Sequence, residues 1–194
     1  MNKSIRWRIM TLQAIICLVL AGSAAILYGA GTFSRSLISD QLTAQKISFP
    51  PASAAVTGGA LDPKEFPSLQ QYAGQAVDNG PKAEAYANNF IGTHLTKIAG
   101  GLTYSQASAK AIADPKNTVL ADQVATLFRG ETLRGLLLNA YGWWTIGTYA
   151  LYGAYAIALA ALFVLLALVF EVTQTVKVRS VISNKTLKGV PATA

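Results

Sequence analysis

The chain has 194 residues, enough for one domain, and its composition is unusual for a soluble one. Hydrophobic residues make up 52% of it and charged residues only 13%, against about a quarter in typical soluble domains. Its single cysteine and single histidine exclude an intramolecular disulfide framework, a cysteine-based zinc or iron–sulfur centre and a multi-histidine metal site. So few charges cannot cover a soluble surface, and we therefore expect part of the chain to face lipid.

Two uncharged apolar runs predict two transmembrane helices. Residues 9–31 would form a helix of about 35 Å, enough to cross a bilayer, after a basic tail at residues 1–8. The tail and Gly22–Ala25 also fit a signal peptide, but the run is too long for a signal-peptide core, which favours an uncleaved anchor. Residues 136–170 would form a helix of about 52 Å, longer than a bilayer needs, so we expect an outside extension there.

The placement of charges predicts the topology. Residues 1–8 and the tail at residues 171–194 are rich in Lys and Arg, whereas basic and acidic residues nearly balance in residues 32–135. The excess of positive charge on the cytoplasmic side of membrane proteins places both termini in the cytoplasm and residues 32–135 outside the plasma membrane. The net charge of +7 is then a topology signal, and no nucleic-acid partner is expected.

Helical patterns fill the segment between the two runs. The helical spacing of apolar residues in Phe33–Gln45 predicts that the first helix continues a few turns past the membrane, and Pro50-Pro51 would stop any helix. The Gly- and Pro-rich residues 52–67 should form a loop. Further helices are expected over 68–76, over 81–99, over 103–113 behind a Thr103–Gln106 capping box, and from Asn117 without a break into the second span. The predicted fold class is all-α, with two transmembrane helices, an extracytoplasmic helical domain, and a second transmembrane helix continuous with that domain.

No pattern of residues indicates catalysis or transport. His94 stands alone, the acidic residues are scattered singly, and no Ser-His-Asp arrangement or phosphate-binding loop can be read from the sequence. Neither apolar run contains an ionisable group for an ion path, and two helices cannot enclose a pore. We therefore expect a non-enzyme without catalytic, cofactor-binding or metal-binding residues, and without a cofactor.

Three groups of residues near the second span are candidates for contact with partners or lipids. The aromatic group at residues 141–144 fits either a membrane-interface belt or a contact surface. Three tyrosines, Tyr149, Tyr152 and Tyr155, lie deeper than a belt needs, beside a glycine in a small-residue face. The charged residues Arg129, Glu131 and Arg134 fit either a helix-surface ion pair or contact with lipid phosphates. The small-residue face could pack against the first span or against another protein. The candidates are Arg129, Glu131, Arg134, Tyr141, Trp143, Trp144, Tyr149, Tyr152 and Gly153.

Several stretches carry a family resemblance. Residues 128–141, residues 144–148 and the Gly-x-Thr-Tyr element at residues 101–104 resemble a family of small actinobacterial membrane proteins with two spans and an outside helical segment. Members often carry the label aromatic ring-opening dioxygenase. Such an enzyme needs an iron site of histidine and carboxylate ligands, which a chain with one histidine does not suggest. The resemblance implies an actinobacterial plasma membrane.

These expectations favour a non-catalytic accessory subunit of a larger plasma-membrane complex. Its partners would be other integral membrane proteins and membrane lipids. A respiratory-chain supercomplex is one host that we consider, on general biological grounds and not from particular residues. The alternative is an autonomous envelope-associated membrane protein whose outside domain binds a lipid or a peptide.

Overall fold

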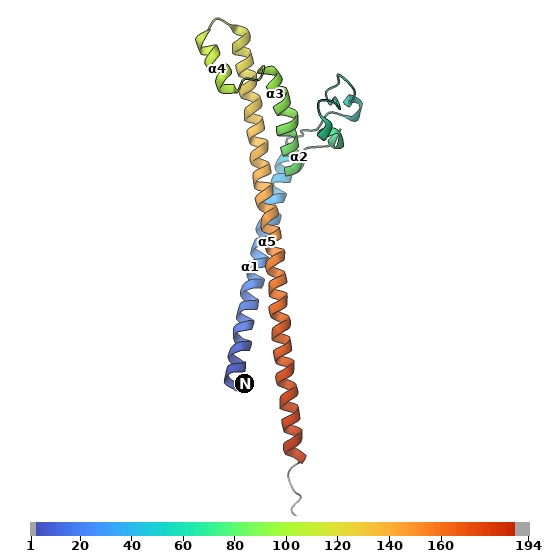
Figure 1. Ribbon diagram of the computed structural model, residues 1–194, viewed down its shortest axis with the longest axis vertical. Helices are drawn as coiled ribbons and strands as arrows, with labels where there is room; N and C mark the ends of the chain where they lie inside the picture. The colour runs from blue at the N-terminus through green and yellow to red at the C-terminus, as the bar shows by residue number, and fades with distance from the viewer. Residues whose placement is uncertain (1–2, 189–194) are drawn as a thin grey trace, which may run out of the picture. The chain divides into compact units, whose positions relative to one another are not determined.

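The computed structural model describes residues 3–188 and the side chains of residues 4–177. Over these residues the fold is all-α, as predicted, and the described chain contains no strand, only one β-bridge between Ser48 and Ala76. The elements in chain order, labelled in Figure 1 where there is room, are α1 (Lys3–Ala44), η1 (Ala52–Ala54), η2 (Pro67–Tyr72), α2 (Gly80–Ala85), η3 (Tyr86–Ile91), α3 (Gly92–Ile98), α4 (Tyr104–Ala113) and α5 (Thr118–Lys188).

Two of these helices, α1 and α5, are long and apolar enough to cross a membrane. The most apolar window within Ser4–Ala44 has a mean hydropathy of 2.2, and that within Thr118–Lys177 has 2.6. Both helices run beyond the limits expected from the apolar runs, because residues on either side of each run continue the helix without a proline to stop it. The chain divides into two compact units, and each long helix contributes to both.

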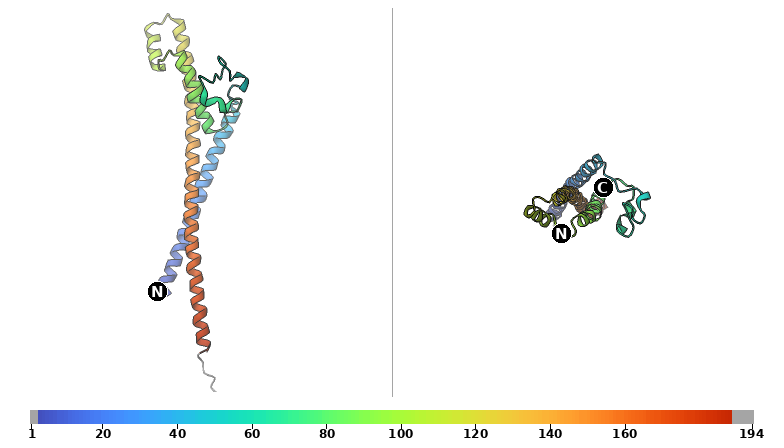
Figure 2. Two further views of the ribbon diagram at one scale, coloured as in Figure 1. Left: turned by 45° about the vertical axis from the view of Figure 1, so that its right-hand side comes forward. Right: turned by 90° about the horizontal axis from the view of Figure 1, so that it is seen from above.

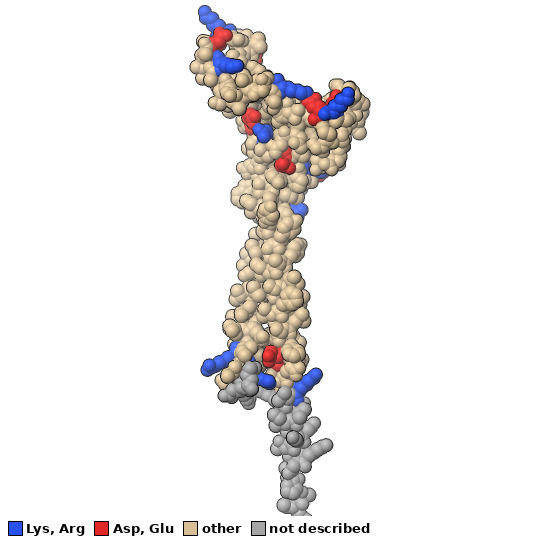
Figure 3. Space-filling view, in the orientation of Figure 1, with Lys and Arg blue, Asp and Glu red and all other residues tan. Residues whose placement is uncertain are grey.

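The first unit, Met1–Ala30 with Ala150–Ala194, is here called the helix-pair unit. Its two helices touch along a narrow seam at which Ala24, Ala154 and Ala161 are buried. The Sγ of Cys17 donates to the carbonyl oxygen of Ala161 at 3.7 Å. In Figure 3 most of the length of this unit is free of coloured Lys, Arg, Asp and Glu side chains, which gather at one end. Two helices can cover only a strip of each other, so most of their apolar surface faces outward.

The second unit, Gly31–Tyr149, is here called the core unit. The end of α1 and the first half of α5 belong to it, and the helices and loops between them are visible from three sides in Figures 1 and 2. Its main core draws on α1, the segment after it, α2, η3 and α5. The buried members are Ile38, Leu42, Phe49, Leu61, Phe66, Leu69, Val77, Ala83, Ala85, Ala87 and Leu137.

The segment from residue 45 to residue 79 is held by backbone hydrogen bonds between its two ends. Phe49 N donates to Gln75 O at 2.9 Å, and Val77 N donates to Ile47 O at 2.9 Å. The helix expected over 68–76 is therefore shorter and of a different type: η2 is a 3₁₀ helix that ends at Tyr72. Residues 75–77 leave the helix because their backbone groups pair with residues 47–49 instead.

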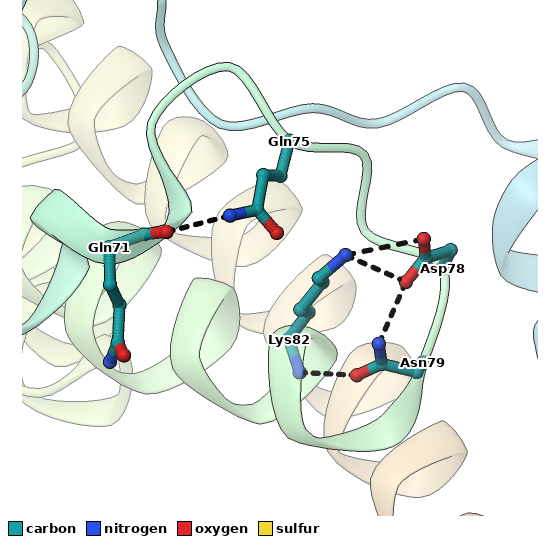
Figure 4. Close-up of polar contacts among 5 residues, drawn as sticks. All are labelled: Gln71, Gln75, Asp78, Asn79 and Lys82. Carbon is teal, nitrogen blue, oxygen red and sulfur yellow. Dashed lines mark hydrogen bonds and ion pairs between the residues drawn. The ribbon is translucent and has the colours of Figure 1, made fainter. Parts of the chain in front are cut away.

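The helix expected over 81–99 is present, but it contains a wider turn. Asn79 caps α2, its Oδ1 accepting from Lys82 N at 3.1 Å, and the Lys82 ammonium pairs with Asp78 at 3.0 Å, as Figure 4 shows. Figure 4 also shows Gln75 Nε2 donating to the carbonyl oxygen of Gln71. Between α2 and α3, η3 is a π-helix. Such turns hold one residue more than an α-turn and occur frequently at functional sites.

A second, smaller core joins α3, α4 and α5. It contains Leu95, Ala99, Ala107 and Leu127. The predicted capping box of α4 is confirmed: Thr103 Oγ1 accepts from Gln106 N at 3.2 Å, and Thr103 N donates to Gln106 Oε1 at 2.9 Å. The predicted cap of α5 is confirmed as well, with Asn117 Oδ1 accepting from Leu120 N at 3.1 Å.

Candidate functional site

The aromatic group at residues 141–144 divides between the interior and the surface of the core unit. Trp144 is half-buried, with the guanidinium carbon of Arg35 4.5 Å from its ring centroid. Its indole also lies directly against Gly80 at the start of α2. Trp143 is 56% exposed, and its carbonyl oxygen accepts a hydrogen bond from Ser34 Oγ at 2.9 Å. Trp144 therefore joins α1, α2 and α5, whereas Trp143 keeps an outward surface suited to a membrane interface or a partner.

Gly147 marks a close approach of α5 to α1 within the core unit. A Cβ at this position would lie 3.0 Å from the carbonyl oxygen of Gly31 and 3.0 Å from the Cβ of Ser34. Close backbone packing of this kind is what small residues allow between apolar helices. The sequence offered Gly153 for that role, and Gly147 was not singled out.

Gly153 has more room in the helix-pair unit. A Cβ there would lie 3.7 Å from Leu27 Cδ1, an ordinary van der Waals distance. At Gly22 and Gly29, a Cβ would meet no atom within 4 Å in the described part of the chain. The seam runs instead through Leu151, Ala154 and Ala161, whose spacing is that of a heptad seam. The seven-residue spacing of Ala154 and Ala161 is the feature of the sequence from which this seam could have been predicted.

The deeper tyrosines face outward from the helix-pair unit and its boundary. Tyr149 is 67% exposed and Tyr152 is 63% exposed. Tyr155 packs edge-on against Tyr28 of α1, with ring centroids 6.3 Å apart. Tyr141, by contrast, is half-buried in the core unit. Tyr149 and Tyr152 thus keep more than half of their surface outside the packing of the described residues.

The charged group on α5 is tied to the π-helix. Arg134 Nη1 pairs with Glu131 Oε2 at 3.3 Å, the i to i+3 pairing that the sequence indicated. Arg134 Nη2 also donates to Asn88 Oδ1 at 3.1 Å, which the sequence did not indicate because Asn88 lies far away along the chain. The Arg134 Nε is buried and has no hydrogen-bond acceptor among the described residues. Arg129 is exposed.

A polar cavity of about 390 Å³ opens beside Arg134. Its walls come from η3 and α3, from the turn between α3 and α4, and from α5. The lining residues are Asn88, Gly92, Thr93, Leu95, Thr96, Gly101, Leu102, Thr103, Tyr104, Leu127, Glu131 and Arg134. Its volume lies at the lower end of the range of about 300–1,000 Å³ that small-molecule pockets occupy.

An apolar groove of about 400 Å³ lies elsewhere in the core unit, between α1 and α5. Its walls are mainly leucine, isoleucine and the indole of Trp143, with three amide side chains at Gln41, Gln45 and Asn139. Leu136 is 64% exposed there. The groove contains no charged residue.

Three titratable side chains of the core unit, Asp62, Tyr86 and His94, are held by backbone hydrogen bonds, burial or ring stacking. The backbone N–H groups of Gly58 and Lys64 donate to the Asp62 carboxylate and hold its pKa below the usual range of aspartate. Burial raises the pKa of Tyr86. Nδ1 of His94 lies 2.7 Å from Phe90 O, and its ring stacks on Phe66. Across the described residues, no group of three or more His, Cys, Asp or Glu side chains could hold a metal ion.

Comparison with known proteins adds no relative: no family model, curated protein or solved structure matches this chain. The class of protein that the structure defines is an all-α chain with two long apolar helices and a helical unit that has its own core. The resemblance to small actinobacterial membrane proteins stays a prediction.

Proposed function

We propose that this protein is a non-catalytic accessory subunit of a larger plasma-membrane complex, with α1 and α5 crossing the bilayer. In this proposal both termini lie in the cytoplasm and residues 32–135 lie outside. The observation that carries it is the outward apolar surface of the two long helices. Only 6% of the apolar window of α1 and 11% of that of α5 is buried inside the chain.

A surface of this kind requires an apolar environment. Leu18, Leu162 and Phe163 are each about half exposed or more, and exposed small residues such as Ala21 and Ala160 lie near them in the sequence. Lipid satisfies the aliphatic side chains, and helices of another protein can approach closely at the small ones. The outward tyrosine rings support a protein neighbour, because tyrosine is enriched in the centres of protein interfaces.

The core unit supports an accessory role rather than a catalytic one. Its polar contacts cap helices and tie segments together, as those of Asn79, Thr103 and Arg134 do. A rigid helical unit attached to membrane helices is suited to holding neighbours in place. One complex that could contain this subunit is a respiratory-chain supercomplex.

Native purification in a mild detergent, followed by mass spectrometry, tests the proposal. We expect other integral membrane proteins to co-purify in fixed stoichiometry. A monodisperse protein that carries only lipid would contradict the proposal and would favour the autonomous envelope protein whose outside domain binds a lipid or a peptide.

A scan of outward alanines would locate the interface. Ala156→Leu and Ala160→Leu add bulk on one face of α5 and Ala158→Leu on the opposite face, all at exposed positions. We expect at least one of them to reduce co-purification several-fold while the protein stays in the membrane. Ala154→Leu is the matched control, because Ala154 is 2% exposed and the added bulk would disturb the pairing of α1 with α5 itself.

A further inference from the structure

The polar cavity beside Arg134 combines features that a merely structural hollow does not need. Its walls come from two segments that are distant in sequence, residues 88–104 and residues 127–134, and the first of them includes part of the π-helix η3. Asn88 in that π-helix is held by Arg134 on one side and by Glu84 on the other, its Nδ2 donating to Glu84 Oε1 at 3.3 Å. The cavity wall is therefore positioned by side-chain hydrogen bonds, as the wall of a binding site is.

The charges of the cavity cancel. Its lining contains one cation, Arg134, and one anion, Glu131, which pair with each other at 3.3 Å. An anionic ligand would be attracted by the first and repelled by the second, and a cationic ligand would meet the reverse. The balance favours a ligand without net charge.

The hydrogen-bonding groups of the cavity include both donors and acceptors. Thr93 Oγ1 donates to Asn89 O at 2.7 Å, and Thr96 Oγ1 donates to Gly92 O at 2.9 Å. Because each hydroxyl hydrogen is used in this way, both oxygens present lone pairs as acceptors. The Arg134 guanidinium presents donors only, and its side chain is 35% exposed. A ligand that matches this lining must both donate and accept, which hydroxyl groups do.

The remaining walls are apolar. Leu95, Leu102 and Leu127 belong to the second core or pack against it, and they also line the cavity. The ring of Tyr104, which is 38% exposed and rests against Phe128, closes one side. A ligand with hydroxyls at its edge and C–H groups on its face would meet both kinds of wall.

We propose that this cavity binds an uncharged saccharide unit of one or two rings. A pyranose ring has the required combination of hydroxyls that donate and accept and an apolar C–H face, and the cavity volume of about 390 Å³ suits one or two such rings. Thr96 and Glu131 accept from ligand hydroxyls, Arg134 donates to them, and the leucines contact the ring face. This site does not depend on the accessory-subunit proposal.

The test measures sugar binding to the full chain in lipid nanodiscs by saturation-transfer NMR, with glucose and maltose as probes. Maltoside detergents are excluded, because their disaccharide head would compete for the cavity. We expect saturable binding of at least one sugar. Absence of binding to both sugars would overturn the proposal, and so would displacement of the sugar by equimolar phosphoethanolamine, which would indicate a site for a zwitterion.

Two variants assign the binding to this cavity. Thr96→Val removes one acceptor at an exposed position, and Glu131→Gln removes the charge but keeps the shape; we expect each to weaken sugar binding at least fivefold. Thr126→Val is the matched control, because Thr126 Oγ1 makes the same type of bond, to Asp122 O at 2.9 Å, outside the cavity. Unchanged binding in both cavity variants, with melting temperatures equal to wild type, would overturn the assignment.

Discussion

The indole of Trp144 lies so close to Gly80 that a Cβ at position 80 would be 2.4 Å from the Trp144 Cγ. No rotation of an alanine methyl relieves such an overlap, so either the indole or the start of α2 must move. We therefore expect Gly80→Ala to destabilise the core unit by about 1–3 kcal/mol, the usual cost of overpacking. Thermal unfolding of the purified protein, followed by near-ultraviolet circular dichroism of the indole, measures this effect.

Gly135→Ala is the control for that experiment. Position 135 lies in α5, and a Cβ there would meet nothing within 4 Å in the described structure. The change should leave stability unchanged or raise it by about 0.5–1 kcal/mol, because alanine is the better helix former. Equal losses at positions 80 and 135 would refute the Trp144 contact.

A second pair of glycines distinguishes close from loose packing of α5 against α1. We expect Gly147→Ala to lower the melting temperature in detergent, since its Cβ would lie 3.0 Å from the backbone oxygen of Gly31, which cannot easily move. The cost should be about 1–3 kcal/mol. Gly153→Ala should have little effect, because the atom nearest to its Cβ is Leu27 Cδ1 at 3.7 Å. A larger effect at 153 than at 147 would contradict this account.

The Asp62 carboxylate makes the loop around residues 58–64 sensitive to acid. The backbone N–H groups of Gly58 and Lys64 bind its charged form and depress its pKa in the folded protein. The stabilisation is therefore present above the ordinary aspartate pKa of about 3.9 and is lost as the pH falls through the lower, folded value. We expect amide exchange at Gly58 and Lys64 to accelerate below about pH 4, after correction for the intrinsic rate.

Asp62→Asn provides the comparison. The amide oxygen can accept one of the two bonds but does not titrate, so the acid-dependent step should disappear while exchange at pH 7 becomes faster than in wild type. An acid-dependent step of unchanged size in this variant would show that another group is responsible.

Cysteine labelling tests the proposed topology. In a Cys17→Ala background, Ser68→Cys and Lys110→Cys should react with a membrane-impermeant maleimide in intact cells, and Ser183→Cys should react only after lysis. The physical reason is the excess of Lys and Arg in both tails, which retains them in the cytoplasm. Labelling of Ser183→Cys alone in intact cells would invert the orientation.

Local signals were sufficient for α4 and for the start of α5. The capping groups at Thr103 and Asn117, and the uninterrupted sequence that follows position 118, predict α4 and α5 because each signal acts within one turn of the chain. The all-α class follows for the same reason, since no alternating pattern competes with the helical one. The Glu131–Arg134 pair could also be predicted, because residues three apart are neighbours on any helix.

The sequence by itself thus determined the helical class, most helix limits and the two apolar helices, because these depend on neighbouring residues. Only the tertiary structure decided that η2 ends at Tyr72, that η3 is a π-helix, and that Trp144 packs on Gly80. The bond between Arg134 and Asn88, and with it the polar cavity, belongs to the same group. Each of these features is a contact between segments far apart in sequence, and its free energy appears only once the chain has folded.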